Sequence, residues 1–229
     1  ESVDVNGIGD YVGGLVGKNY GSITSSCSTG TVNGSDLVGG LVGRNDEGSI
    51  MSSYNTGTVS GDSYVGGLAG YNYYSSITSS FSAVMVTGNN NIGGLAGQNH
   101  LASISKCYSN GSVNGNVYVG GLVGRNFSDA KISSCYSTGS VAGNDHVGGL
   151  VGNSYPKNIR NCFWDIETSG QSESAGGTGK ATAQMQDINT FLNAGWDFIG
   201  ETDNGTEDIW WIDNGLDYPR LWWEMEPDD

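Results

Sequence analysis

The chain is poor in basic residues, and this shortage limits the partners that we expect. Of its 229 residues only 9 are Lys or Arg, against 24 Asp or Glu, so the formal net charge is −15. A nucleic-acid partner requires a basic face. The sequence also has no run of about 18 apolar residues, the length that a membrane-spanning helix needs. We therefore expect no nucleic-acid partner and no membrane insertion.

Histidine, cysteine and proline are also scarce. The two histidines, His100 and His146, and four cysteines that include no Cys-x-x-Cys pair provide no zinc constellation. Glycine is abundant, with 39 residues, yet only 3 residues are proline. Collagen combines glycine at every third position with much proline, so a collagen-like fold is excluded.

Glycine instead belongs to a motif that returns six times. The motif is Val-Gly-Gly-Leu-Val-Gly or a close variant, and its leucines are Leu15, Leu41, Leu68, Leu95, Leu122 and Leu150. Successive leucines are separated by 26, 27, 27, 27 and 28 positions. A fixed period of this length is typical of a solenoid, in which each repeat is one coil stacked on the previous one.

Further columns appear when the repeats are aligned. An aliphatic column runs through Ile23, Ile50, Ile77, Ile104, Ile132 and Ile159, and four residues later lie Cys27, Tyr54, Phe81, Tyr108, Tyr136 and Phe163. Apolar residues alternate with Ser and Thr, which indicates strands with one buried face. We predict an all-β, three-sided parallel β-solenoid of about six coils, right-handed by the usual preference of parallel crossovers.

The glycine motif leaves one point open. Strict alternation places Val12 and Val16 on the face opposite Leu15. Either the two glycines bend the chain so that both valines turn inward, which we favour, or the valines form an outward apolar stripe for lateral association.

The composition changes beyond the repeats, so we divide the chain into a solenoid over residues 1–163 and a capping region over residues 164–229. All six tryptophans follow Cys162. Residues 181–194 predict one helix or two short ones, with Thr182 as a possible N-cap and Gly195 as a stop. Two closing strands are expected at 209–212 and 220–223. We expect this acidic, Trp-rich region to cover the last core layer of the solenoid.

The start of the chain aligns with the third strand of a coil. Residues 2–7 match residues 29–34, so that Val5 corresponds to Val32 and the turn glycine Gly7 to Gly34. Val3 and Val5 therefore predict an open strand edge, which is a template for pairing with another chain. We expect this edge to accept another copy head to tail, which could propagate into a filament.

The repeated Gly-Gly-Leu-Val/Ala-Gly core, the following Ile, the Cys-Tyr-Ser segment and the Gly-x-Val-x-Gly segment resemble the GLUG motif over about residues 10–163. This motif occurs in tandem in large secreted or surface proteins of bacteria and archaea, including adhesin-like proteins and IgA-specific metallopeptidases. The resemblance implies an extracellular or cell-surface β-solenoid. The His-Glu-x-x-His motif of the metallopeptidases is not in this sequence.

Two columns raise questions of covalent or metal chemistry. Cys107, Cys135 and Cys162 share one column, where they form either a ladder of buried thiols, which we favour, or one bridge between adjacent coils. The coil corners carry Asp10, Asp36, Asp62, Asn89, Asn116 and Asp145. Such residues make turns, and their oxygens could also bind Ca²⁺, the one cofactor that we consider.

Sugars are the other ligands considered. Trp210, Trp211, Trp222 and Trp223 could stack on sugar rings, although paired tryptophans more often form core. Asn33, Asn110, Asn126 and Asn204 begin glycosylation sequons, and we expect Asn126 and Asn204 to lie in loops.

The coils have no insertion that could wall a cleft, so we expect no enzyme. The favoured function is an extracellular structural or adhesive solenoid, which could assemble head to tail as a fibre subunit. A carbohydrate-binding module of a larger secreted protein is the alternative, with surface glycans as partners. A polysaccharide-degrading enzyme ranks third.

Overall fold

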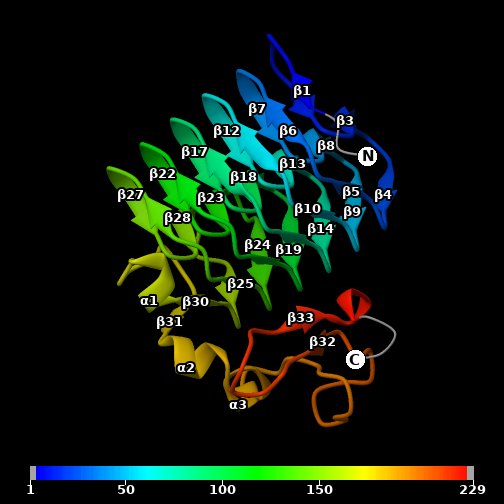
Figure 1. Cartoon of the computed structure of the whole chain (residues 1–229), viewed down its shortest axis with the longest axis vertical. Coiled ribbons are helices and arrows are strands. Elements are labelled where there is room, and N and C mark those ends of the chain that lie inside the picture. The colour runs from blue at the N-terminus through cyan, green and yellow to red at the C-terminus, as the bar shows by residue number, and fades with distance from the viewer. Residues whose placement is uncertain (1–3, 226–229) are drawn as a thin grey trace.

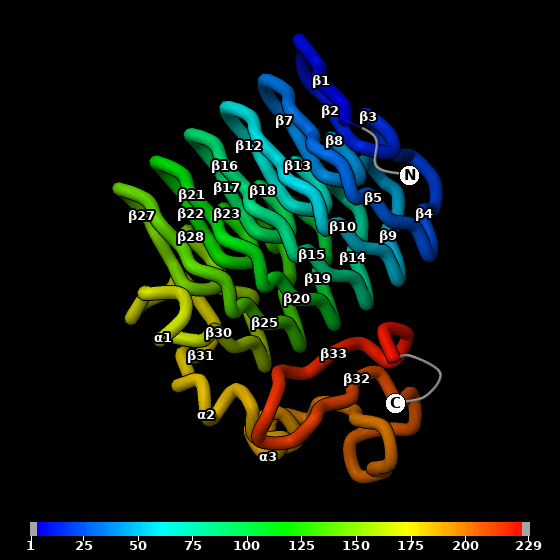
Figure 2. The backbone as a smooth tube through the Cα atoms, in the orientation of Figure 1, coloured from blue at the N-terminus to red at the C-terminus, as the bar shows by residue number. Residues whose placement is uncertain are grey.

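The computed structural model describes residues 4–225, which form a parallel β-solenoid and a C-terminal region packed along its side (Figure 1). Corresponding strands of successive coils pair in parallel, for example Val32 with Val59. Figure 2 shows the coils stacked one behind another from the N-terminal end. The all-β parallel solenoid of about six coils that the sequence period predicts is confirmed.

Five sheets run along the solenoid, and each takes one short strand from every coil. Sheet A contains β1 (Val5–Asn6), β6 (Thr31–Asn33), β11 (Thr58–Ser60), β16 (Met85–Thr87), β21 (Val113–Asn114) and β26 (Val141–Ala142). Sheet B contains β2 (Val12–Gly13), β7 (Asp36–Gly39), β12 (Ser63–Gly66), β17 (Asn90–Gly93), β22 (Val117–Gly120) and β27 (Asp145–Gly148). Sheet C contains β3 (Val16–Asn19), β8 (Val42–Asp46), β13 (Ala69–Tyr73), β18 (Ala96–His100), β23 (Val123–Phe127) and β28 (Val151–Tyr155). Sheet D contains β4 (Ser22–Thr24), β9 (Ser49–Met51), β14 (Ser76–Thr78), β19 (Ser103–Ser105), β24 (Lys131–Ser133) and β29 (Ile159–Arg160). Sheet E contains β5 (Cys27–Ser28), β10 (Tyr54–Asn55), β15 (Phe81–Ser82), β20 (Tyr108–Ser109), β25 (Tyr136–Ser137), β30 (Phe163–Asp165) and β31 (Thr178–Lys180).

A coil therefore has five strands where the sequence pattern suggested three, because two of the expected strands are divided. Between sheets D and E the dividing residue has a positive φ, as in Ser52 with a φ of 47°. A residue in this left-handed region turns the chain and interrupts the alternation of side chains. Ile50 consequently lies in the solenoid core, whereas Tyr54 lies on the outer side of sheet E against the C-terminal region.

The core consists of two clusters on either side of the Gly-Gly bend. Val38 belongs to one cluster and Val42 to the other, and both are fully buried. The inward bend of the motif is thus confirmed, and the outward apolar stripe is wrong. The leucines from Leu41 to Leu150 are also fully buried, but Leu15 of the first coil is 52% exposed.

The second glycine of each motif is required by a close crossing with sheet E. A Cβ on Gly67 would lie 1.9 Å from Ser82 Oγ and 2.1 Å from the Gly94 carbonyl oxygen. No side chain fits at that separation, so glycine is the residue that lets the coils close at this point.

A ladder of amides and a column of thiols run inside the solenoid. Asn19, Asn45, Asn72, Asn99 and Asn126 are buried, and each donates its amide to the next residue of the ladder at 2.8–3.2 Å, ending on Ser154. Cys107, Cys135 and Cys162 are buried free thiols, as we favoured, whereas Cys27 is exposed.

The last coil is closed by a small part of the C-terminal region. Ser174 Oγ accepts from the backbone N–H of Val151 at 2.9 Å, and the N–H of Ala175 donates to the Val151 carbonyl at 2.9 Å. β31 pairs with β30. Trp164 is 6% exposed and joins the core cluster at this end.

We expect from the sequence that the whole C-terminal region covers the end of the solenoid, and this is wrong for the rest of it. It runs back along sheet E instead (Figure 1). The aromatic side chains of sheet E explain this position, because they point outward and form an apolar face along the solenoid that is stabilised by burial. They are Tyr54, Phe81, Tyr108, Tyr136 and Phe163. The region contains α1 (Ile166–Ser169), α2 (Thr182–Met185), α3 (Ile188–Leu192), β32 (Trp210–Trp211), β33 (Arg220–Leu221) and the 3₁₀ helix η1 (Trp222–Glu224).

The segment 181–194 forms two short helices, which agrees with one of the two expected forms. Thr182 is not the N-cap of α2: Ala181 occupies that position, and the Thr182 hydroxyl donates to Asp165 at 2.8 Å. Gly195, with a φ of 78°, follows the end of α3 as predicted. None of the helices within residues 4–225 has the length and apolar character needed to cross a membrane.

Candidate functional site

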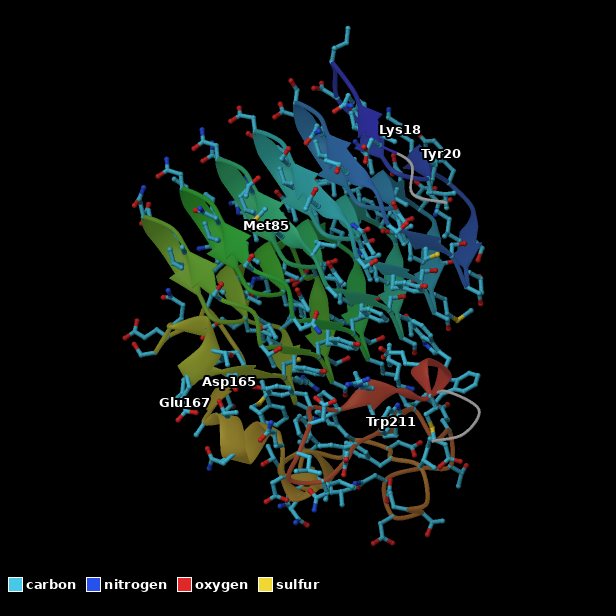
Figure 3. The ribbon with its side chains drawn as sticks, viewed as in Figure 1. Lys18, Tyr20, Met85, Asp165, Glu167 and Trp211 are labelled. Carbon is cyan, nitrogen blue, oxygen red and sulfur yellow. The ribbon has the colours of Figure 1, made fainter. Side chains whose placement is uncertain are left out.

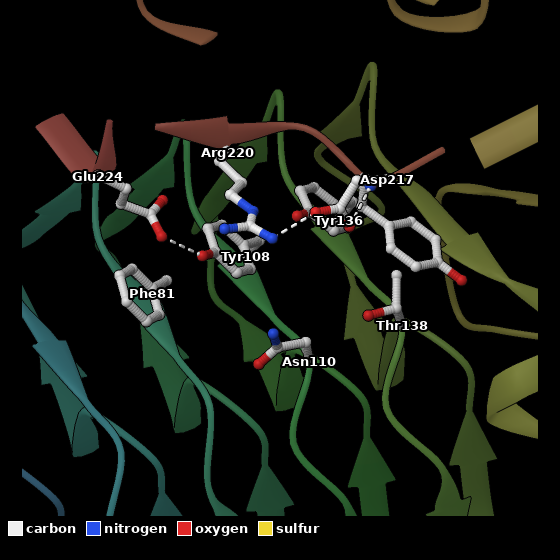
Figure 4. A pocket seen from close by; sticks show the side chains of 9 residues that line it. Phe81, Tyr108, Asn110, Tyr136, Thr138, Asp217, Arg220 and Glu224 are labelled. Carbon is white, nitrogen blue, oxygen red and sulfur yellow. Dashed lines mark hydrogen bonds and ion pairs between the residues drawn. The ribbon is translucent and has the colours of Figure 1, made fainter. Parts of the chain in front are cut away.

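A groove separates sheet E from β33 and has a volume of about 260 Å³ (Figure 4). Its floor is formed by the edges of Phe81, Tyr108 and Tyr136, whose rings are stacked with centroids 4.9–5.0 Å apart. Each ring face in this ladder is covered by the next ring. The groove therefore offers ring edges and polar groups to a ligand, and no open face for stacking.

The polar side chains of the groove mainly fix the C-terminal segment to the solenoid. The Tyr108 hydroxyl donates to Glu224 Oε2 at 2.6 Å, and the other carboxylate oxygen accepts from the Leu221 N–H at 2.7 Å. Burial raises the pKa of Glu224 above its usual range, and it also raises the pKa of Tyr108. Arg220 pairs with Asp217 within the same C-terminal segment. The Glu224 carboxylate is thus engaged in holding the segment to the solenoid, and the Asp217 carboxylate is engaged within the segment.

The four tryptophans predicted to stack on sugars do not form one platform. Trp210 is only 1% exposed and packs against Trp196, so a sugar has no access to it. Trp223 stacks on Tyr54 and Phe81, and its indole donates to the Ser79 carbonyl at 3.1 Å. Trp222 is 52% exposed, and Trp211 is partly buried in the C-terminal region (Figure 3).

The sequon asparagines have different surroundings. Asn126 lies on β23 and not in a loop, because its side chain belongs to the buried amide ladder; that expectation is wrong. Asn204 is half-buried and donates to the Leu192 carbonyl at 2.9 Å. Asn33 donates to Asn6 at 2.7 Å, and Asn110 is exposed.

Of the two residues of the predicted assembly edge, Val3 lies outside the described residues. Val5 is half-buried in β1 and pairs with Val32. Leu15 adds an exposed apolar side chain on the same first coil.

No group of three or more His, Cys, Asp or Glu side chains in residues 4–225 is placed to hold a metal ion. At the coil corners, Asp36 Oδ1 accepts from the Ser63 N–H at 3.1 Å, which is a turn contact between coils. Calcium binding by the Asx column stays a prediction.

The outer face of sheet C carries two adjacent rows of side chains that the sequence reading did not single out. We call them the sheet C strip; one row is Lys18, Arg44, Tyr71, Gln98, Arg125 and Asn153, and the other is Asp46, Tyr73, His100, Phe127 and Tyr155. Lys18 marks the N-terminal end of the strip in Figure 3. The first five glycine motifs end in a Gly-x-Asn-x pattern, and the sixth has Ser154 in place of the asparagine. This pattern is the sequence signal for two outward columns, one on each side of the buried residue.

The strip is held together by contacts between rings and guanidinium groups. Arg44 lies 4.8 Å from the ring centroid of Tyr73 and also pairs with Asp46 at 3.0 Å. The Tyr71 hydroxyl lies 2.7 Å from His100 Nδ1, and His100 contacts Phe127 edge to face. Burial raises the pKa of Tyr71 to about 12. The strip is thus an ordered surface of planar side chains.

Comparison with known proteins gives one family and one relative. The model of the GLUG motif matches residues 34–60, 61–87, 88–114 and 115–142. A protein of Evansella cellulosilytica described as a putative Gly-rich membrane protein is 42% identical over 62 residues, which are 27% of this chain and 6% of that protein. No solved structure matches significantly. The four tandem matches coincide with complete coils of the solenoid, so the coils over residues 34–142 are GLUG-motif repeats.

Proposed function

We propose that the chain is a non-enzymatic structural and adhesive module that works outside the cell or at its surface. The observation that carries this proposal is the in-register stacking of the coils around a continuous core, which makes a stiff support. Because side chains repeat at coil intervals, such a support displays the sheet C strip as one extended contact surface. The description of the relative as a membrane protein is in keeping with a place at the cell surface.

The proposal is tested by coating beads with the chain and measuring their retention on bacterial cell-wall and mucin surfaces under flow. We expect retention that falls several-fold when Tyr73 and Tyr155 are both replaced by Ser. Release of reducing sugar from those surfaces by the chain alone would instead identify an enzyme and overturn the proposal.

Head-to-tail assembly into a fibre is a second candidate, favoured by the exposed Leu15 and the half-buried Val5 on the first coil. Since residues 173–180 close the other end, the contact must join coil 1 to that closed end. Sedimentation velocity should show association that rises with concentration and disappears in Leu15→Glu. Leu216→Glu, at a 74% exposed site in the C-terminal region, serves as the control.

Carbohydrate binding through the C-terminal region is a further candidate, and it now depends on the exposed Trp222 and the partly exposed Trp211. The indole N–H of Trp211 is buried and has no hydrogen-bond partner within residues 4–225, so a sugar would contact only the exposed part of this ring. Binding to a glycan array that is lost in Trp222→Ala, with an unchanged circular dichroism spectrum, would support it. Unchanged array binding in that variant would exclude Trp222 from the site.

A further inference from the structure

Arg125 is a positioned cation without an anionic partner among the described residues. Its guanidinium lies 4.5 Å from the ring centroid of Phe127 and 5.3 Å from that of Tyr118. Within residues 4–225 its Nε is buried and has no hydrogen-bond partner, and the same is true of Arg44 Nε. Arg44, on the same row, differs because its guanidinium pairs with Asp46. The chain has 24 acidic residues available for pairing, so an arginine held between two rings and left unpaired is a feature to explain.

The row also contains an unpaired polar group next to Arg125. Gln98 occupies the adjacent coil in register with Arg125 and is 5% exposed, and its Oε1 also has no hydrogen-bond partner in the described part of the chain. His100 accepts or shares the proton of Tyr71, and burial, followed by the charge of Arg125, lowers the pKa of His100. The imidazole therefore stays neutral near pH 7, and Arg125 supplies the positive charge at this place.

Three of the nine basic residues of the chain, Lys18, Arg44 and Arg125, lie in this single row, which contains no acidic residue. Positions along the row recur at the strand spacing of about 4.8 Å. Lys18 and Arg44 lie on neighbouring strands, Arg125 lies three strands further on, and Arg44 is already paired with Asp46, so a ligand that matches the row is an extended polymer that carries an anionic group at Arg125. Sugar rings of a polysaccharide suit it, because planar amide, guanidinium and aromatic side chains can contact both hydroxyl groups and the apolar faces of the rings.

We propose that the sheet C strip binds a carboxylated polysaccharide, with a sugar carboxylate paired to the Arg125 guanidinium and the chain of sugars lying along the solenoid axis. This inference rests on the adhesive role proposed above and names its ligand class. The acidic C-terminal region of a second copy is the other anionic occupant to consider. It is disfavoured because the middle of the strip presents unpaired polar groups on Gln98 and Arg125, which suit hydroxyl and carboxylate groups, whereas the apolar recess beside Phe127, Tyr155 and Pro156 lies at one end of the strip.

The test uses biolayer interferometry with polygalacturonate and hyaluronate as carboxylated probes, and methyl-esterified polygalacturonate as the uncharged counterpart of the first. We expect the chain to bind at least one carboxylated probe. If it binds polygalacturonate, it should bind the methyl ester at least tenfold more weakly than the free acid. Arg125→Gln should weaken binding at least tenfold. Arg160→Gln removes an equal charge from an exposed position on sheet D and should leave binding unchanged.

Three outcomes would overturn the proposal. They are no binding to either carboxylated probe, equal binding of polygalacturonate and its ester, and unchanged binding in an Arg125→Gln variant whose melting temperature matches the original chain. Self-association that Arg125→Gln abolishes would assign the strip to a second copy instead. If the coated beads adhere but both acids fail to bind, the ligand class is wrong and the adhesive role stands; if neither occurs, both fail.

Discussion

At the scale of single residues, buried polar groups decide where substitution is costly. From Asn45 to Asn126, each asparagine of the internal ladder accepts from the preceding residue of the ladder and donates to the next one, so these amides have partners on both sides. A buried polar group that loses its partner costs more than the lost hydrogen bond is worth, because it was removed from water and is no longer compensated. The ladder is therefore sensitive at its centre.

We expect Asn72→Ala to lower the free energy of unfolding by about 2–4 kcal/mol, because it leaves Asn99 Oδ1 without its donor and leaves the Asn45 amide only its contact with the Ser76 carbonyl. Asn114→Ala, on an exposed position of sheet A, should change it by less than about 0.5 kcal/mol. Urea unfolding followed by circular dichroism measures both. Equal losses in the two variants would show that the ladder does not contribute.

Glu224 gives a prediction of pH dependence. Because burial raises its pKa in the folded chain above the usual value of 4.5, its contribution to stability is fully present below that value. The contribution is lost as the pH rises through the raised folded-state pKa. We expect Glu224→Gln to raise the melting temperature by roughly 2–4 °C at pH 7 and by less at pH 4.

The control for this effect is Glu207→Gln. The hydrogen bond from Lys106 lowers the pKa of Glu207, so ionisation of this carboxyl stabilises the folded chain, which is the opposite of the effect at Glu224. That variant should gain no stability at pH 7. A gain in Glu224→Gln that is the same at pH 4 and pH 7 would contradict the assignment of the effect to ionisation.

At the scale of elements, the period of the glycine motif predicted the stacking of the coils. The pattern beyond Cys162 predicted one helix or two short ones, of which the structure has two, and two closing strands, of which the second ends at Leu221 where a 3₁₀ helix begins. The direction of the aromatic column was not predictable from alternation. Ser52 and its equivalents adopt a positive φ without being glycine, so the sequence carries no signal for the turn that sends Tyr54 outward. The position of the C-terminal region on sheet E follows from that turn and was missed with it.

The closing of the last coil is the element-scale prediction. Trp164 is 6% exposed in the core, whereas Trp222 is 52% exposed, so the two residues form a matched pair. We expect Trp164→Ala to cost about 3–5 kcal/mol of unfolding free energy, and Trp222→Ala to cost less than about 1 kcal/mol. Guanidinium unfolding measures both. A Trp164→Ala cost no greater than that of Trp222→Ala would mean that β31 and residues 173–175 close the coil without the indole.

At the scale of the whole molecule, the coils form a one-dimensional stack in which each contacts mainly its neighbours. The two ends are unequal, because residues 173–180 cover the last coil while Leu15 of the first is exposed. The C-terminal region adds a second asymmetry. It reaches from the last coil back to Tyr54 of the second coil through Trp223, and so ties coils 2 to 6 together along sheet E.

We therefore expect amide hydrogen exchange to be fastest in the first coil, residues 4–28, and slow and nearly uniform in sheets C and D from the second coil onward. Local opening of a coil costs little where one side has no stacked neighbour, and it costs close to the global free energy where both sides are covered. Exchange followed by mass spectrometry resolves the coils as separate peptides.

A Trp223→Ala variant should raise exchange in Tyr54–Asn55 and Phe81–Ser82 while leaving β28 unchanged, since the last coil does not depend on that contact. Exchange that rises evenly along all six coils in this variant would show instead that the solenoid opens as one cooperative unit.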